Sequence, residues 1–360
     1  MTNKAFRVVL AGGGTGGHII PAIAVADEVV RLGGTVRFVG TEGRIEEKLV
    51  PQAGYGIDFI KVKPLAGGGP GRKISGLASA PVSVLKSAAL LKRIAPSVVI
   101  GVGGYVAGPV VLAARLMGIP TALLEQNATI GLANKILKPV IKHAFVSYEQ
   151  TVHEFQKGKA EFTGNPVKQQ ILDAAQKPKK KSNTVHILVM GGSQGAKTID
   201  ERVPEAIASA KLTRKINVVH QGQPANLTNA QKKYDEAKIN AVTTPFIDDT
   251  AGAFRTADLV IARSGATTVA ELTVMGLPAI FLPYPHHADK QQEKNAAPMR
   301  DLGAAIVIDE KTTGVPELTA AIEEMLETPD RLESAASASK KLGRPDAASV
   351  IASRLYEMAL

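Results

Sequence analysis

Two apolar stretches of this chain each end in a glycine-rich turn that is followed by a helical pattern. Arg7–Ala11 runs into GGGTGG at 12–17, and Val185–Met190 runs into GGSQGA at 191–196. A strand, a glycine turn and a helix in this order present backbone N–H groups at a helix N-terminus, where they bind phosphate. Because the pattern occurs twice, we predict a duplicated α/β design in which each half holds a phosphate-bearing substrate.

Shorter apolar runs repeat the alternation of strand, loop and helix in both halves. They lie at 36–40, 98–101 and 122–124, and again at 217–220, 259–262 and 279–282. Such alternation is typical of a parallel sheet with helices on both faces, which binds ligands beyond the carboxyl ends of its strands.

The length of 360 residues exceeds what a single hydrophobic core usually supports, so two domains are expected. We predict an N-terminal domain of residues 1–163 and a C-terminal domain of 164–343, with the crossing at the Gly164–Asn165–Pro166 turn. By analogy with similar architectures, a final helix of about 344–360 is expected to return to the first domain.

Composition excludes several classes of site. The chain has no cysteine, which removes disulfides, thiolate nucleophiles and zinc sites that need sulfur. Lys4 and Arg7 interrupt the first apolar residues, so we expect no signal peptide and a location inside the cell. The uncharged stretch between Arg93 and Arg115 is broken by prolines and glycines, and we predict that it does not span a membrane.

The positive charge is concentrated in the first half. Residues 1–162 hold 19 Lys and Arg against 10 Asp and Glu, and so carry almost all of the net charge of +10. No acidic residue occurs between Asp58 and Glu125. This part of the surface should attract polyanions, including anionic lipid headgroups.

Polar residues follow three candidate strands of the first half. His18 closes the first glycine turn, Tyr105 follows the strand at 98–101, and Glu125 and Asn127 follow the strand at 122–124. We expect them to face one crevice, because the carboxyl ends of parallel strands meet at one edge. An imidazole near its usual pKa takes a proton from a bound hydroxyl, which makes His18 a candidate general base. A capping or packing role for His18 is the alternative.

In the second half, the run RSGATTVAE at 263–271 follows a strand and opens a helix. Ser264 or Thr267 is placed to cap that helix, and its free N–H groups and dipole suit a pyrophosphate. Glu271 lies about one turn further in, where a carboxylate can hold two ribose hydroxyls. No D-x-D triplet is present to chelate a nucleotide-bound magnesium, so we expect no metal.

Taken together, these motifs resemble the MurG family of bacterial N-acetylglucosaminyltransferases, which convert lipid I to lipid II in peptidoglycan synthesis. The matches run in order over almost the whole chain. They are GGTGGH (13–18), GVGGYVAGP (101–109), EQN (125–127), GNPV (164–167), GGSQGA (191–196), FIDD (246–249), RSGA…E (263–271) and DKQQ (289–292) with Asn295.

The resemblance implies a GT-B fold: two Rossmann-like domains with a deep interdomain cleft, the acceptor and the membrane on the first domain and UDP-GlcNAc mainly on the second. It implies His18 as the candidate base, with Glu125 or a water as alternatives. The acceptor contacts that it implies are Gly13, Gly14, Tyr105 and Asn127. The implied donor contacts are Thr15, Gly16, Gly17, Asn127, Lys168, Ser193, Ile247, Ala266, Thr267, Thr268, Glu271 and either Gln291 or Gln292.

One position departs from the family pattern. After GNPV the family typically has an arginine at the donor site, and this chain has Lys168. Lysine keeps the charge but lacks the planar fork of arginine, so we expect a weaker or differently arranged contact.

The resemblance suggests a function for the basic stretch. Apolar Ile74, Leu77, Val82, Leu85 and Leu91 alternate with Lys86, Lys92 and Arg93, which suits a peripheral contact with the cytoplasmic face of the membrane, whose inner leaflet is anionic. An ordinary amphipathic core helix is the alternative, because aromatic anchors are missing.

The expected reaction is an inverting transfer of GlcNAc from UDP-GlcNAc to the muramyl 4-hydroxyl of lipid I, without a cofactor or a nucleic-acid partner. Three other classes stay open. A UDP-GlcNAc epimerase uses two such domains. An NAD-dependent oxidoreductase would rest on the first glycine turn and on Glu42 as the acid near the end of the second strand. A non-catalytic membrane adaptor would need only the basic patch.

Overall fold

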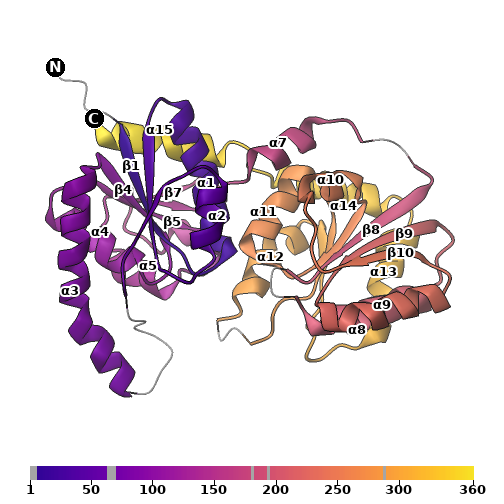
Figure 1. The fold of residues 1–360 in the computed structure, drawn as a ribbon. Helices are drawn as coiled ribbons and strands as arrows, with labels where there is room; N and C mark the ends of the chain where they lie inside the picture. The colour runs from indigo at the N-terminus through magenta and orange to yellow at the C-terminus, as the bar shows by residue number, and fades with distance from the viewer. Residues whose placement is uncertain (1–5, 63–69, 180–181, 193–194, 287–288) are drawn as a thin grey trace. The chain divides into compact units, whose positions relative to one another are not determined.

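A computed structural model describes residues 6–62, 70–179, 182–192, 195–286 and 289–360, and for 70–80 the backbone alone. The chain forms two compact units, one of residues 1–168 with 345–360 and the other of 169–344 (Figure 1). Each unit has its own parallel sheet.

The sheet of the first unit has the strand order β3-β2-β1-β4-β5-β6-β7. Its strands are β1 (Arg7–Gly12), β2 (Thr35–Gly40), β3 (Ile57–Phe59), β4 (Val98–Gly103), β5 (Thr121–Glu125), β6 (His143–Val146) and β7 (Ala160–Phe162). The order reverses between β1 and β4. Loops leaving the carboxyl ends of these two strands therefore diverge and open a ligand crevice.

Helices cover both faces of this sheet, as predicted (Figure 1). They are α1 (Gly16–Arg31), α2 (Glu46–Gln52), α3 (Pro70–Ile94), α4 (Ala107–Leu116), α5 (Leu132–Leu137), α6 (Glu149–Val152) and α15 (Ala347–Ala359). Val8 and Leu10 of β1 pack in one core with α1 and α15, whereas Val9 and Ala11 pack in the other with α3 and α4. This division follows from the two-residue period of a strand.

The sheet of the second unit has the order β10-β9-β8-β11-β12-β13, and it reverses between β8 and β11. Its strands are β8 (Thr184–Met190), β9 (Lys215–Gln221), β10 (Asn240–Thr244), β11 (Leu259–Ala262), β12 (Ala279–Phe281) and β13 (Ala305–Val307). Its helices are α7 (Gln169–Gln176), α8 (Lys197–Ser209), α9 (Pro224–Glu236), α10 (Thr250–Thr256), α11 (Ala266–Met275), α12 (Gln291–Asp301), α13 (Val315–Glu327) and α14 (Arg331–Lys341).

The last helix, α15, belongs to the first unit, where Ile351 and Leu355 pack against α1. The uncharged stretch after Arg93 forms the end of α3, strand β4 and most of α4. Within the described part of the chain, no helix combines the length and the apolar character that a membrane span requires.

Candidate functional site

His18 lies in the first turn of α1, at the reversal point of the first sheet. Its Nδ1 atom is 3.1 Å from the carbonyl oxygen of Gly13 and 3.2 Å from Oγ1 of Thr15. A carbonyl oxygen only accepts, so Nδ1 donates and the lone pair of the neutral ring lies on Nε2. Burial lowers the pKa of His18, against the raising effects of the Gly13 carbonyl and of the Glu125 and Glu46 charges. The neutral ring therefore offers Nε2 as a proton acceptor.

Glycines allow the turn after β4 to pack against this histidine. The Gly13 N–H donates to the Gly103 carbonyl at 3.2 Å, and a Cβ atom on Gly12 would lie 2.4 Å from that oxygen. Gly103 has a φ of +103°, and a Cβ there would lie 2.8 Å from Nε2 of His18. A larger residue at Gly103 would displace the imidazole. The glycines of the GVGG motif thus make room for the candidate base.

Glu46, at the start of α2, is a site residue that the sequence interpretation missed. The side chain is fully buried, and its two oxygens accept hydrogen bonds from the Gly14 N–H (2.9 Å) and the Thr41 N–H (3.1 Å). It therefore joins the turns after β1 and β2. In the sequence, Glu46 is an acidic residue at the start of a helix. Stabilisation of the helix dipole explains that position without any role in the site. Glu42, considered as the acid of a dinucleotide site, is exposed.

Glu125 ends β5 and organises the loop that follows it. Its Oε1 accepts from the backbone and side-chain nitrogens of Asn127 at 3.1 and 3.4 Å. Its Oε2 accepts from the Gly131 N–H and from Nδ2 of Asn134, both at 2.9 Å. The carboxylate is almost completely buried and hydrogen-bonded at both oxygens. Its geometry fixes the position of Asn127.

The glycine turn of the second unit follows β8. The Gly191 N–H donates to the Gln221 carbonyl at 3.1 Å, and a Cβ on Gly191 would lie 2.6 Å from the Ala196 nitrogen. Nε2 of Gln221 donates to the carbonyls of Gly192 (3.4 Å) and Pro245 (3.1 Å). Gln221 therefore ties the turn after β8 to the loop after β10. Ser193, predicted as a donor contact, lies outside the described residues.

Asp200, in the first turn of α8, holds the neighbouring loop after β9. Its Oδ2 accepts from the Gln223 N–H at 3.0 Å and from Nδ2 of Asn226 at 2.9 Å, and its Oδ1 lies 3.4 Å from Nε2 of His220. Nδ1 of His220 in turn lies 3.0 Å from the Tyr234 hydroxyl. The buried network fixes the loop after β9, whose Gln223 side chain packs against Gly195 of the glycine turn.

The turn after β11 opens α11, and its cap differs from the prediction. The N-cap is Gly265, without a side-chain capping bond, so the expectation that Ser264 or Thr267 caps this helix is wrong. Ser264 instead donates to the Gln292 carbonyl at 2.8 Å, since it is fully buried against α12. The buried Oγ1 of Thr267 has no hydrogen-bond partner among the described residues. The first turn of α11 therefore keeps its donors for a ligand.

The two glutamines at the start of α12 have different surroundings. Oε1 of Gln292 accepts from the Tyr284 N–H at 2.9 Å, which fixes the loop after β12. The side chain of Gln291 forms no hydrogen bond within the described residues, and it is half-buried. The amide oxygen of Gln292 is therefore already used, whereas both amide atoms of Gln291 remain for a ligand.

Each of the other predicted contacts follows a strand along the chain, either in a loop or in the next helix. Tyr105 is 49% exposed after β4, and Lys168 is half-buried at the end of the first unit. Ile247 follows the edge strand β10, and its carbonyl accepts from the Thr250 hydroxyl at 3.4 Å. Glu271 is half-buried within α11.

Known proteins resemble this chain over both units. The glycosyltransferase family 28 N-terminal domain matches residues 8–146, and the C-terminal domain of that family matches 186–351. A relative from Anaeromyxobacter sp. (strain K) is 41% identical over 98% of this chain and 93% of its own length. It is named UDP-N-acetylglucosamine–N-acetylmuramyl-(pentapeptide) pyrophosphoryl-undecaprenol N-acetylglucosamine transferase.

Solved structures agree with that similarity. The structure of Acinetobacter baumannii MurG has a TM-score of 0.81 and 30% identity, covering 98% of this chain and 99% of its own. A UDP-GlcNAc 2-epimerase from Neisseria meningitidis has a TM-score of 0.68 at 16% identity, covering 98% of this chain and all of its own. The second likeness is one of fold alone.

Proposed function

This chain belongs to the MurG family within glycosyltransferase family 28, and from that premise we propose that it transfers GlcNAc from UDP-GlcNAc to lipid I. Its two Rossmann-like units are those of the GT-B fold. The products are lipid II and UDP. The observation that carries the chemistry is the oriented neutral imidazole of His18, with its acceptor atom Nε2 at the reversal point of the first sheet.

In the proposed reaction, Nε2 of His18 takes the proton of the muramyl 4-hydroxyl as that oxygen attacks the anomeric carbon of GlcNAc. The new C–O bond forms on the face opposite the UDP oxygen, whose bond to the anomeric carbon breaks, so the configuration inverts. Glu125 and Glu46 favour the imidazolium that forms, since their charges raise the pKa of His18. Both act through the histidine and its loops rather than as bases.

The donor is proposed to bind the second unit through α11. The N–H groups of Ala266, Thr267 and Thr268 and the helix dipole stabilise the pyrophosphate as its charge grows. Glu271 binds the ribose hydroxyls, and the backbone of Ile247 binds uracil. Of the two glutamines, Gln291 contacts the sugar, because Gln292 is engaged by the Tyr284 N–H.

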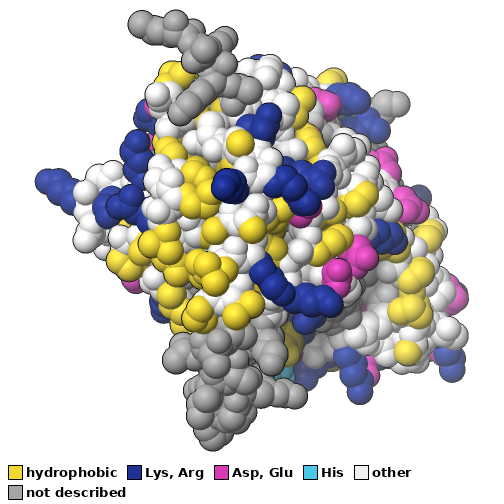
Figure 2. Space-filling view, turned by 60° about the vertical axis from the view of Figure 1, so that its left-hand side comes forward, with side chains coloured by type: hydrophobic (Ala, Val, Ile, Leu, Met, Phe, Trp, Pro, Cys, Tyr) yellow, Lys and Arg dark blue, Asp and Glu magenta, His cyan; other side chains and the backbone are white. Residues whose placement is uncertain are grey.

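The first unit is proposed to bind the cytoplasmic face of the membrane. Exposed apolar side chains gather on the face covered by α3 and α4, with Lys and Arg among them (Figure 2). Leu85 is 70% exposed on α3, and Leu116 is 73% exposed at the end of α4. Lys86, Lys92 and Arg115 lie in the same elements, and Ile74 and Leu77 fall among the side chains that are not described. Leu91, which the sequence placed on this surface, is only 1% exposed and packs in the core instead. Exposed leucines beside cations suit an anionic lipid surface.

The proposed reaction is tested by measuring UDP release with and without a lipid I analogue. We expect release that depends on the acceptor. Turnover of UDP-GlcNAc without acceptor would favour an epimerase, and quenching of nicotinamide fluorescence by the protein would favour an oxidoreductase. Binding to anionic vesicles without any UDP release would favour a non-catalytic membrane adaptor.

A further inference from the structure

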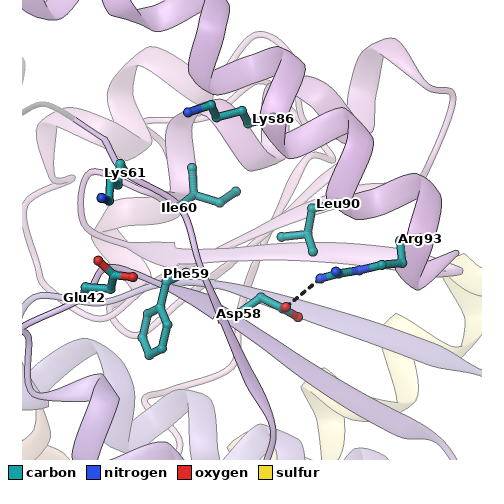
Figure 3. Close-up of a pocket in the computed structure, with 8 residues that line it drawn as sticks. All are labelled: Glu42, Asp58, Phe59, Ile60, Lys61, Lys86, Leu90 and Arg93. Carbon is teal, nitrogen blue, oxygen red and sulfur yellow. Dashed lines mark hydrogen bonds and ion pairs between the residues drawn. The ribbon is translucent and has the colours of Figure 1, made fainter.

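A cavity lies in the first unit, one side of it formed by the ends of β2 and β3 and the other by α3 (Figure 3). It is about 360 Å³ and is lined by Glu42, Asp58, Phe59, Ile60, Lys61, Lys86, Leu90 and Arg93. Lys86, Leu90 and Arg93 follow one another along one side of α3 at a spacing of three to four residues, so they share a helix face. The proposed reaction assigns no role to this cavity.

The charges at the two ends of the cavity differ. At one end Asp58 is neutralised, because its carboxylate accepts from Arg37 at 2.6 Å and from Arg93 at 2.8 Å. At the other end Lys61 and Lys86 form no ion pair within the described residues (Figure 3). Counting all lining residues, three cations face two carboxylates. The excess positive charge favours an anionic ligand.

The floor between these ends is apolar. Ile60 is 5% exposed and Leu90 is half-buried, whereas the ring of Phe59 points away from α3 (Figure 3). An inorganic phosphate would leave this floor uncovered and would meet the carboxylate of Glu42 at the mouth. A peptide with a free carboxyl end fits better, because it supplies a carboxylate for the lysines, N–H groups for Glu42 and small apolar side chains for the floor.

The cavity is also connected to the candidate acceptor turn. Glu42 follows Thr41, whose N–H shares the carboxylate of Glu46 with the N–H of Gly14. Glu42 therefore lies one residue beyond the position that Glu46 ties to the turn preceding His18. Because β1 and β2 are parallel neighbours, the loops that leave their carboxyl ends, one leading to His18 and the other to Glu42, start side by side.

We propose that this cavity binds the peptide of the acceptor, with Lys61 and Lys86 holding its terminal carboxylate. The proposal rests on the proposed function, which supplies a pentapeptide-bearing acceptor. The peptide thereby contributes to acceptor affinity without contacting the reacting atoms.

The test compares two soluble acceptors, a muramyl pyrophosphate that carries the pentapeptide and the same compound without it. In the double variant Lys61→Gln/Lys86→Gln, we expect KM for the pentapeptide acceptor to rise about tenfold, as for loss of charge-assisted hydrogen bonds. KM for the acceptor without peptide and for UDP-GlcNAc should stay unchanged. Lys48→Gln, which removes an exposed charge on α2, is the matched control and should change none of the three.

Two results would overturn the assignment. An equal rise of KM with both acceptors would show that the lysines bind the pyrophosphate. If KM rises with neither acceptor, the cavity has no role in acceptor binding. Calorimetry with the free pentapeptide and with its C-terminal amide needs no turnover, and we expect the amide to bind the wild type more weakly. If the wild type releases no UDP with either acceptor, the proposed function fails while the calorimetry still tests the cavity.

Discussion

The imidazole of His18 is oriented by the carbonyl oxygen of Gly13, 3.1 Å from its Nδ1 atom. The contact selects the tautomer in which Nε2 is unprotonated. Because the acceptor is a backbone carbonyl of the protein itself, this tautomer does not depend on a bound substrate. Burial lowers the pKa of the ring, so its acceptor form persists below the pH at which a free histidine is half protonated.

The first prediction concerns pH. Protonation of Nε2 removes the lone pair, so kcat/KM should fall as the pH falls, with an apparent pKa below the usual histidine value of about 6.5. His18→Ala should lower kcat about 10²–10⁴-fold and remove this acid limb. Normal turnover of the His18→Ala variant at saturating substrate would refute the assignment of the base.

Glu125→Gln provides the matching experiment on the neighbouring carboxylate. Its charge raises the pKa of His18, so its removal should move the acid limb to lower pH. We expect a smaller loss of kcat than for His18→Ala, because Glu125 holds the loop through Asn127 and Gly131. A larger loss, together with disappearance of the acid limb, would identify Glu125 as the base.

The second prediction concerns Glu46. Glu46→Gln replaces one of two buried acceptor oxygens by an NH2 group that faces an N–H donor, so it should cost about 1–3 kcal/mol of unfolding free energy. The turn at Gly14 should loosen, and KM for the acceptor should rise more than KM for UDP-GlcNAc. Chemical denaturation and steady-state kinetics measure both effects. The exposed neighbour Glu47→Gln is the control, and an equal loss of stability there would contradict the role of Glu46.

The third prediction concerns Gln221. Gln221→Leu removes the side-chain N–H group that donates to the Gly192 and Pro245 carbonyls. The loops after β8 and β10, which we propose to bind UDP-GlcNAc, should then no longer be tied together. We expect KM for UDP-GlcNAc and the inhibition constant of UDP to rise about tenfold, with KM for the acceptor unchanged. Equal changes for donor and acceptor would indicate general destabilisation instead.

The strands that the sequence predicts well are the buried central ones. β1, β4, β8 and β11 are continuous apolar runs, as expected for strands covered on both faces. β3, β6, β7, β10 and β13 were not predicted. They are short or partly exposed, and β10 reads NAVTT, so their apolar pattern is weak and pairing with a formed sheet defines them.

The site was predictable wherever a residue lies at the carboxyl end of a strand or in the turn that follows it. Glu125 ends β5 and His18 closes the glycine turn after β1, so the carboxyl end of a strand fixes their edge of the sheet. Gly14, which donates to Glu46, and the two carbonyls that accept from Gln221 lie in loops distant in sequence, which no local pattern reveals. The wrong prediction for Ser264 has a similar cause, because its hydroxyl donates to the Gln292 carbonyl of α12, distant in sequence, instead of capping α11.

The fourth prediction concerns Asp200 and the stability of the second unit. Burial acts to raise its pKa, but hydrogen bonds from His220, Asn226 and the Gln223 N–H outweigh it, and the pKa lies below the ordinary value. The ionised carboxylate therefore stabilises the fold above the pKa of the unfolded chain, and this stabilisation is lost as the pH falls through the folded pKa. Asp200→Asn should cost about 1–3 kcal/mol at pH 7. The difference from the wild type, measured by urea denaturation, should shrink as the pH falls through the lowered folded-state pKa of Asp200, since the wild-type carboxylate then becomes protonated as well. A difference that is constant with pH would show that the charge of Asp200 is not what stabilises the support of the glycine turn.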